Sequence, residues 1–404
     1  MTVVGLIAEY NPFHNGHKYH IEKARELAHA DMVIVVMSGN FVQRGVPALM
    51  PKHLRAETAL KAGASLVIEL PVCYATASAE QFAYGAVSLL DKLGCVDAVC
   101  FGSECGEISM LKSLADVLAE EPEAYREILQ RYLRRGDSFP VARQIAMKEH
   151  LKSDFPDEVL SEPNNILAIE YLKALRRLHS RIRPIAIQRI SSHYHDEELK
   201  EEISSATAIR NTFAGNSGFS TKLTAQIPET GISLLKENYQ KRYPVFPNDV
   251  SLLLKCKLLK ENKTSLQEYA DVSEELANRI ANSLSQYLNF EQFCRLLKTK
   301  EVTYSRISRA LIHILLDIKK SDMSEIEYAH VLGFRADDSA LFSKIKQEAS
   351  IPLLSKLTNV ENLSESAKQM LQLDILAADF YESIVTEKFR TPFQSEYCHP
   401  VIRI

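Results

Sequence analysis

A chain of 404 residues is long enough for two or three domains, and its hydrophobic and charged fractions, 46% and 25%, are typical of a globular protein in water. No apolar run reaches the roughly 18 residues of a membrane-spanning helix, and the first residues are not expected to form a secretory signal. The net charge of −4 shows no global basic excess, and seven cysteines without a C-x-x-C pair predict reduced thiols in a cytoplasmic protein.

Five apolar runs in the first two hundred residues predict the strands of a parallel sheet. They are rich in Val and Ile and do not alternate with polar residues, as expected for strands covered on both faces. Helical patterns lie between them, for instance over residues 53–62 and 79–93. We expect a doubly wound α/β fold, in which ligands bind beyond the C-terminal strand ends. The runs are residues 3–8, 32–37, 65–70, 98–101 and 184–187.

The first run ends in a turn and meets the motif His14-Asn15-Gly16-His17, which precedes a helical pattern over residues 19–28. This order gives a phosphate-binding arrangement, because a helix N-terminus carries free N–H groups and Gly16 allows close approach of the backbone. Histidines near strand ends are more often structural, but this context favours function. We predict that His14 and His17 stabilise charge on a phosphoryl group.

The loops after the other predicted strands carry further candidates. The loop after the second run is expected to line the substrate pocket, although a solvated turn is the alternative. Lys52 and Arg55, which follow it, either neutralise a bound anion or lie on an exposed helix face. The predicted pocket residues of the loop are Ser38, Gly39, Asn40, Gln43 and Arg44.

Five residues later in the chain are candidate nucleotide contacts. Gly102 and Ser103 follow the fourth run, where a glycine permits close approach of a ring or sugar and a plain turn is the alternative. Asn164 and Asn165 open a helix over residues 166–175, and two asparagines exceed what one cap needs. Arg189, at the end of the fifth run, is a candidate phosphate or adenine contact.

A second helix start follows at residues 203–211, where Ser205 and Thr207 can cap N–H groups or bind phosphate oxygens. Arg210, one turn into that helix, can reach outer phosphates and is predicted to be catalytic. The preceding residues His193, His195 and Asp196 favour a mobile loop over a metal site, so no metal site is predicted.

The rest of the chain is expected to be helical, except for residues 389–404, which are expected to be extended. We predict a catalytic domain over residues 1–220, with a helical insertion at 107–160, and a mainly helical domain over 221–404. Residues 241–310 hold twelve Lys and Arg against eight Asp and Glu, with aromatic residues between them. This pattern favours RNA binding, although an ordinary helical bundle is nearly as plausible. The candidate RNA contacts are Lys241, Arg242, Lys255, Lys257, Arg306 and Arg309.

Together the two motifs resemble those of the nucleotidylyltransferase superfamily, with Ala206 replacing a hydroxyl of its second signature S-S/T-T-x-I-R. This departure leaves the roles of the individual serines less certain than that of Arg210. Longer stretches resemble the bacterial tRNA(Met) cytidine acetate ligases along nearly the whole chain. These stretches are residues 5–17 (GLIAEYNPFHNGH), 37–45 (MSGNFVQRG), 101–104 (FGSE), 163–167 (PNNIL), 203–210 and 303–311 (TYSRISRAL).

The resemblance implies a nucleotidylyltransferase-like Rossmannoid sheet that ligates acetate to RNA. Acetate would attack the α-phosphate of ATP, with Mg²⁺, to form acetyl-adenylate. The N4 amine of the wobble cytidine of elongator tRNA(Met) would then take the acetyl group, without coenzyme A. ATP would lie along Ile7, Ala8, Glu9, Tyr10, Asn11, Pro12, Phe13, His14, Asn15, Gly16, His17, Lys18, Tyr19 and His20, with Gly102, Asn164, Asn165 and Arg189.

Two other functions remain open from the residues alone. A true nucleotidylyltransferase would keep AMP on a small phosphorylated substrate, but it would need no basic helical region. A non-catalytic RNA-binding protein that senses ATP is the other alternative, and the intact His14, His17 and Arg210 weigh against it.

Overall fold

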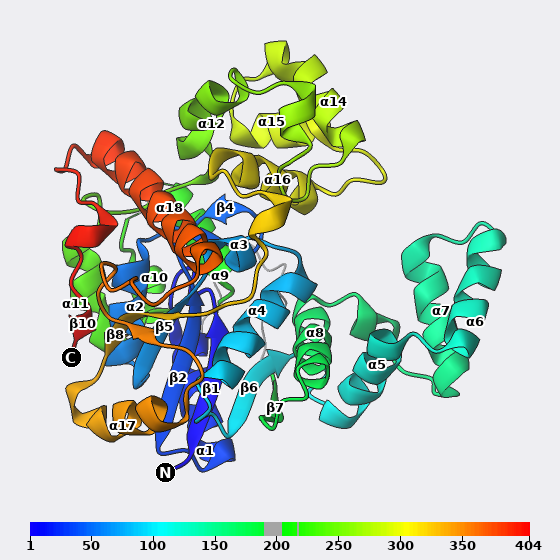
Figure 1. Cartoon of the computed structure of the whole chain (residues 1–404), viewed down its shortest axis with the longest axis horizontal. Coiled ribbons are helices and arrows are strands. Elements are labelled where there is room, and N and C mark those ends of the chain that lie inside the picture. Colours follow the sequence, from blue (N-terminus) through cyan, green and yellow to red (C-terminus); the bar gives the residue numbers. More distant parts are fainter. Residues whose placement is uncertain (190–203, 216–217) are drawn as a thin grey trace.

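A computed structural model describes residues 1–189, 204–215 and 218–404, so the predicted loop with His193, His195 and Asp196 lies outside it. Within these residues the centre is an eight-stranded sheet of order β10-β8-β5-β2-β1-β6-β7, with β9 beside β8 (Figure 1). A short hairpin, β3–β4, lies apart from it. The strands are β1 Val3–Ala8, β2 Met32–Ser38, β3 Phe41–Val42, β4 Val46–Pro47, β5 Leu66–Leu70, β6 Ala98–Ser103, β7 Arg183–Gln188, β8 Ala329–Phe334, β9 Leu353–Leu354 and β10 Ile402–Arg403.

The predicted parallel sheet is confirmed, since β5, β2, β1, β6 and β7 pair in parallel and match the five apolar runs to within a few residues. Both faces are covered. Side chains such as Val4 and Leu6 pack against α1 and α2, whereas Val3 and Ile34 face the layer that contains α4 and α8. The chain leaves β1 toward β2 and returns to the other side of β1 as β6, which creates a switch point between β1 and β6.

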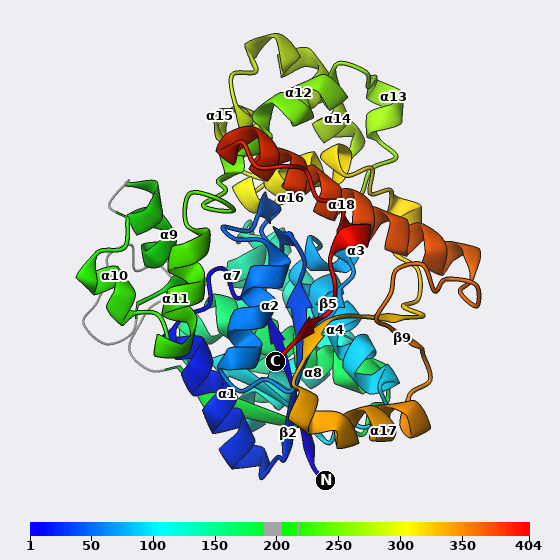
Figure 2. The same cartoon turned by 90° about the vertical axis from the view of Figure 1, so that its left-hand side faces the viewer.

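Helices surround the sheet and extend beyond it. Figure 1 shows α6 and α7 standing away from the sheet at the right, and a cluster of α12 to α16 at the top. Figure 2 shows the long helix α18 crossing beside that cluster. The helices are α1 Asn15–Ala28, α2 Lys52–Lys61, α3 Val72–Ala75, α4 Ala79–Lys92, α5 Ile108–Glu120, α6 Glu123–Arg134, α7 Phe139–Leu151, α8 Pro163–Arg177, α9 Ala206–Ala214, α10 Thr221–Ala225, α11 Glu229–Asn238, α12 Ser251–Leu258, α13 Lys263–Leu266, α14 Glu274–Ser283, α15 Phe290–Leu297, α16 Tyr304–Leu315, α17 Ser339–Glu348 and α18 Glu365–Phe389.

None of the helices in the described part of the chain combines the length and the apolar character that a bilayer crossing requires.

The C-terminal half also contributes strands: β8 and β9 lie where only helix was expected, and β10 lies in the segment that was expected to be extended. Strand β8 pairs antiparallel with β5, and β9 and β10 pair parallel with β8. These strands extend the sheet of the first half from residues far along the sequence. The division of the chain near residue 220 remains a prediction.

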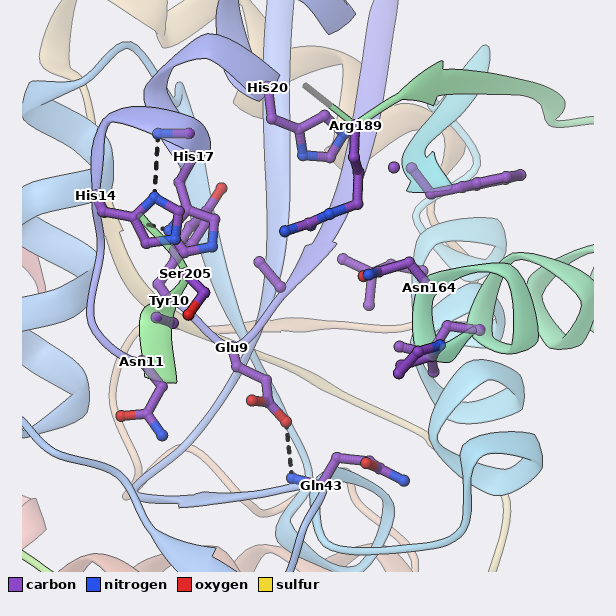
Figure 3. Close-up of a pocket in the computed structure, with 18 of the residues that line it drawn as sticks. Glu9, Tyr10, Asn11, His14, His17, His20, Gln43, Asn164, Arg189 and Ser205 are labelled. Carbon is purple, nitrogen blue, oxygen red and sulfur yellow. Dashed lines mark hydrogen bonds between the residues drawn. The ribbon is translucent and has the colours of Figure 1, made fainter. Parts of the chain in front are cut away.

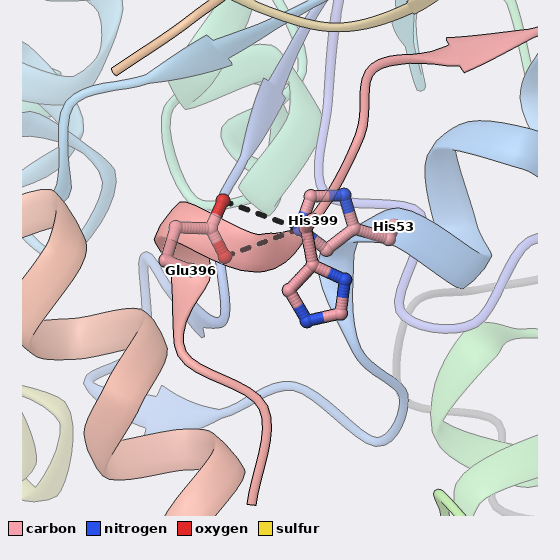
Figure 4. Close-up of side chains that lie close together, drawn as sticks. All are labelled: His53, Glu396 and His399. Carbon is pink, nitrogen blue, oxygen red and sulfur yellow. Dashed lines mark hydrogen bonds and ion pairs between the residues drawn. The ribbon is translucent and has the colours of Figure 1, made fainter. Parts of the chain in front are cut away.

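A buried charge network fastens the C-terminal segment to α2. Lys52 is fully buried, and its Nζ lies 2.7 Å from Oε2 of Glu69 and 2.9 Å from Oε1 of Glu396. Figure 4 shows Glu396 also reaching His53, whose Nε2 is 3.1 Å from Oε2. Burial disfavours the charge on Glu396, but Lys52 and His53 outweigh burial and lower the pKa of that carboxyl.

We therefore expect Glu396→Gln to lower the free energy of unfolding by about 3 kcal/mol at neutral pH, the scale for breaking a buried ion pair. The loss should shrink as the pH falls below the ordinary pKa of 4.5, because the lowered pKa of Glu396 stabilises the fold only where the unfolded chain is ionised. Urea unfolding at a series of pH values measures both effects.

Glu387→Gln provides the control, since Glu387 forms an exposed pair with Arg390 in the same part of the chain and should change stability little. An equal effect of the two substitutions would contradict the structural role of Glu396.

Candidate active site

A cavity of about 390 Å³ opens at the switch point of the sheet (Figure 3). Its walls come from the C-terminal ends of β1, β6 and β7 and from the first turns of α1, α8 and α9. Three of these walls are helix N-termini, whose free N–H groups favour anions. The cavity therefore lies where the topology predicts a ligand, and it presents several groups that attract negative charge.

The two histidines of the motif cap helix α1, which begins at Asn15, four residues before the predicted pattern. Nδ1 of His14 accepts a hydrogen bond of 3.0 Å from the Gly16 amide, and Nδ1 of His17 accepts one of 3.3 Å from the His14 amide. The two rings stack with centroids 3.8 Å apart. Because both Nδ1 atoms accept, the neutral rings carry their proton on Nε2.

These imidazoles stay neutral at physiological pH. Burial, and then the positive charges of Arg189 and Arg210, lower the pKa of His14 to about 3. Burial lowers the pKa of His17 well below its ordinary range, with smaller contributions from His14, Arg189 and His20. The pKa of His20 falls to about 4 through burial and Arg189. The cavity thus presents neutral N–H donors to a ligand, and its positive charge resides on arginines.

Arg210 and Arg189 reach the cavity from α9 and from the end of β7. Arg210 donates from Nη1 to the carbonyl oxygen of Asn11 at 2.7 Å and from Nη2 to Oγ1 of Thr207 at 2.9 Å, which ties α9 to the loop before α1. Ser205 caps α9 by accepting from the Ala208 amide at 3.1 Å. A Cβ on Gly102 would lie 3.3 Å from Cγ of Arg189, so the glycine leaves room for this side chain.

Glu104 fixes the start of α8, a role that the sequence did not indicate. Its carboxylate accepts from the Asn164 and Asn165 amides at 3.2 and 2.8 Å and from Nδ2 of Asn164 at 2.6 Å. In return, Oδ1 of Asn165 accepts from the amides of Glu104 and Cys105. Asn164 lines the cavity, whereas Asn165 is buried behind it. A glutamate that caps a helix 60 residues away leaves no local pattern in the sequence.

The loop after β2, which was predicted to line the substrate pocket, divides into two parts. Gln43 and Arg44 line the cavity, but Ser38, Gly39 and Asn40 do not. Their polar groups hold α2 instead, since the Ser38 and Gly39 carbonyls accept from Arg55 and Oδ1 of Asn40 accepts from the Lys52 amide.

Both expectations for Lys52 and Arg55 were wrong, because each side chain is buried and bound within the protein. Arg55 is 1% exposed, and its guanidinium donates to carbonyl oxygens, among them those of Glu9 and Met50. The charges of these two residues therefore serve the fold beneath the cavity rather than an exposed face or a ligand.

Most of the predicted ATP-binding residues meet at the cavity. The lining includes Ile7, Ala8, Glu9, Tyr10, Asn11, His14, Gly16, His17, Tyr19, His20, Gly102, Asn164, Arg189, Ser205, Thr207 and Arg210. The predicted residues that lie outside the lining are Pro12, Phe13, Asn15, Lys18, Ser103 and Asn165.

The six candidate RNA contacts differ in availability. Lys241, Lys255 and Arg306 are exposed. The other three are engaged within the protein: Arg242 pairs with Glu382 at 2.9 Å, Lys257 with Asp317 at 2.7 Å and Arg309 with Asp271 at 2.7 Å.

In the part of the chain that the structure describes, two groups of side chains away from the cavity have the composition of metal sites. These are His53, Glu396 and His399, and Glu69, His330 and Glu396. Lys52 already places its ammonium between Glu69 and Glu396, and so supplies the positive charge there. The rings of His53 and His399 stack within 19° of parallel, so their in-plane lone pairs do not converge on one ion. These groups act as a structural network.

Comparison with known proteins agrees with this geometry. The model of the family described as HIGH Nucleotidyl Transferase matches residues 1–396. A tRNA(Met) cytidine acetate ligase of Acetivibrio thermocellus is 41% identical, with 94% of each chain covered, and one of Thermoanaerobacter sp. is 40% identical over the full length of both. Crystal structures of Thermotoga maritima TmcAL, 32% identical over both whole chains, superpose with TM-scores of 0.91 for the apo form and 0.89 for the form bound with alpha-thio ATP. The chain therefore belongs to the HIGH nucleotidyl transferases and, within them, to the family of tRNA(Met) cytidine acetate ligases.

Proposed function

We propose that this protein uses ATP to attach acetate to the N4 amine of the wobble cytidine in elongator tRNA(Met). The observation that carries the proposal is the pair of neutral imidazoles at the start of α1, facing a cavity that Arg189 and Arg210 also line. Full-length relatives bear the name of this ligase, and the Thermotoga neighbour has been crystallised with an ATP analogue. Both findings support the same reaction.

In the first half-reaction an acetate oxygen attacks the α-phosphorus of ATP and the bond to the β-phosphate breaks, which releases pyrophosphate and leaves acetyl-adenylate. His14 and His17 would donate from Nε2 to phosphoryl oxygens, because their Nδ1 atoms are already occupied. Arg210 would neutralise charge on the leaving pyrophosphate. Neutral donors suit this step, since they remain protonated on Nε2 at every physiological pH.

Mg²⁺ is expected to accompany ATP and to neutralise its phosphates. Glu9 is the only carboxylate among the described residues that line the cavity. The protein therefore offers few hard oxygen ligands, and phosphate oxygens and water would supply most of the coordination.

In the second half-reaction the cytidine amine attacks the acetyl carbonyl and AMP leaves, giving N4-acetylcytidine. The tRNA would lie across α12 to α16, where Lys255 and Arg306 are exposed. Helix α16 contacts the loop that carries Gln43 and Arg44, since Oγ of Ser308 donates to the Gly45 carbonyl at 2.7 Å. Because the proposed substrate is tRNA, the proposal also places the protein in the cytoplasm.

Incorporation of radiolabelled acetate into bulk bacterial tRNA tests the proposal, with ATP present and acetyl-CoA absent, followed by nucleoside analysis. We expect ATP-dependent label in N4-acetylcytidine. Consumption of ATP without label in tRNA would instead indicate a nucleotidylyltransferase with another acceptor.

We expect His17→Ala to slow acetate-dependent exchange of pyrophosphate into ATP by ~10²-fold or more, the usual scale for losing a donor to the transition state. Glu22→Ala is the matched control, because Glu22 lies on the same helix with an exposed side chain. Near-normal exchange by the His17 variant would remove this residue from the mechanism.

Charge reversal at Lys255 and Arg306, the two exposed candidates of α12 to α16, should weaken tRNA binding without changing acetate-dependent pyrophosphate exchange. Two lost phosphate contacts would lower the slope of log affinity against log salt by about 2, which filter binding at several salt concentrations measures. Lys346→Glu on α17, an exposed lysine on the other side of the molecule, is the control (Figure 1). Unchanged tRNA affinity would place the RNA elsewhere on the protein.

A further inference from the structure

Glu9 stands out in the cavity because its charge has the wrong sign for the ligands of the first half-reaction. ATP and acetate are anions, and the other charged residues known to line the cavity are Arg44, Arg189 and Arg210. A carboxylate repels acetate and the phosphates of ATP, so its place in the cavity calls for a hydrogen-bond donor or a cation beside it. A hydrogen-bond donor such as an amine meets that need.

The carboxylate of Glu9 is held in a fixed position with one oxygen available. Oε1 accepts a hydrogen bond of 3.0 Å from the backbone amide of Gln43, and the backbone carbonyl of Glu9 accepts one of 2.5 Å from Arg55. No described residue contacts Oε2 by a hydrogen bond or ion pair. Both anchors are hydrogen bonds within the protein, so Glu9 is oriented before any substrate binds.

Glu9 and Gln43 lie apart from His14, His17 and Arg189, and Figure 3 shows the two groups at different sides of the cavity. The imidazole and arginine side suits phosphates. The Glu9 side joins the β3–β4 hairpin, and a Cβ at Gly45 of that hairpin would collide with the Arg309 backbone of α16. Glu9 is therefore on the side of the cavity that connects to the basic helical cluster.

We propose that Glu9 is the catalytic base that receives the proton of the acceptor amine in the second half-reaction, an inference that rests on the proposed function. The N4 nitrogen forms a bond to the acetyl carbon while the bond from that carbon to the AMP oxygen breaks. AMP leaves with the electron pair, and a proton of N4 moves to Oε2 of Glu9, which later releases it to water.

The same contact between Glu9 and the amine also selects the nucleobase that is acetylated. A carboxylate accepts a hydrogen bond from the N4 amine of cytosine. Uracil carries an oxygen acceptor at the corresponding position, so it would bring two acceptors together and be rejected. Glu9 thereby contributes to specificity as well as to proton transfer.

Separate measurement of the two half-reactions in Glu9→Gln tests the proposal. Adenylation is measured as acetate-dependent exchange of pyrophosphate into ATP without tRNA. Transfer is measured in a single turnover, as the movement of acetyl groups from preformed enzyme-bound acetyl-adenylate to tRNA. We expect transfer to fall ~10²-fold or more relative to exchange, the scale of a general base. Glu9→Asp, which keeps the carboxylate, should restore part of the transfer rate.

Three outcomes would overturn the proposal. If Glu9→Gln slows both half-reactions equally, Glu9 serves to support the ATP-binding loop. If the variant slows pyrophosphate exchange and added Mg²⁺ restores the rate, Glu9 is a metal ligand. Normal transfer would exclude any contact with the amine. Failure of the unaltered protein to catalyse either half-reaction would instead refute the proposed function, so the two failures are distinguishable.

Discussion

The reciprocal cap at the start of α1 is the interaction on which the cavity depends. His14 and His17 satisfy backbone amides through Nδ1, and this leaves both Nε2–H groups for a ligand. The same bonds that begin the helix therefore set the tautomers of the rings. Burial then keeps the rings neutral, so their hydrogen-bonding role does not change with pH in the physiological range. The hydrogen bonds that begin helix α1 therefore also prepare the two rings to donate to a ligand.

A second layer of charge lies beneath the strand ends and does not touch the cavity. Arg55 binds carbonyl oxygens at the ends of β1 and β2, and Lys52 bridges Glu69 and Glu396. Burial lowers the pKa of Arg55 to about 10, yet the guanidinium remains charged at neutral pH. Such buried groups are stable only with every partner in place, so this layer makes the loop before α1 rigid.

The sequence predicted the features whose signals are local. Non-alternating apolar runs gave the parallel strands, and the His14 to His17 motif between strand and helix gave the cavity. It did not predict β8, because that strand pairs with a strand more than two hundred residues earlier. Lys52 and Arg55 were misplaced for a related reason. Their burial depends on partners such as Glu69 and Glu396, which no pattern within α2 indicates.

The closure of the sheet by the last residues has a consequence for biosynthesis. Until β8 and β10 emerge from the ribosome, β5 presents an unpaired edge, and Lys52 lacks one of its two carboxylate partners. A nascent chain that contains the whole cavity but not yet residues 329–403 is therefore exposed to edge-to-edge aggregation. A nonsense mutation just ahead of residue 329 would consequently leave the edge of β5 unpaired for good, although the chain it encodes contains every residue that lines the cavity.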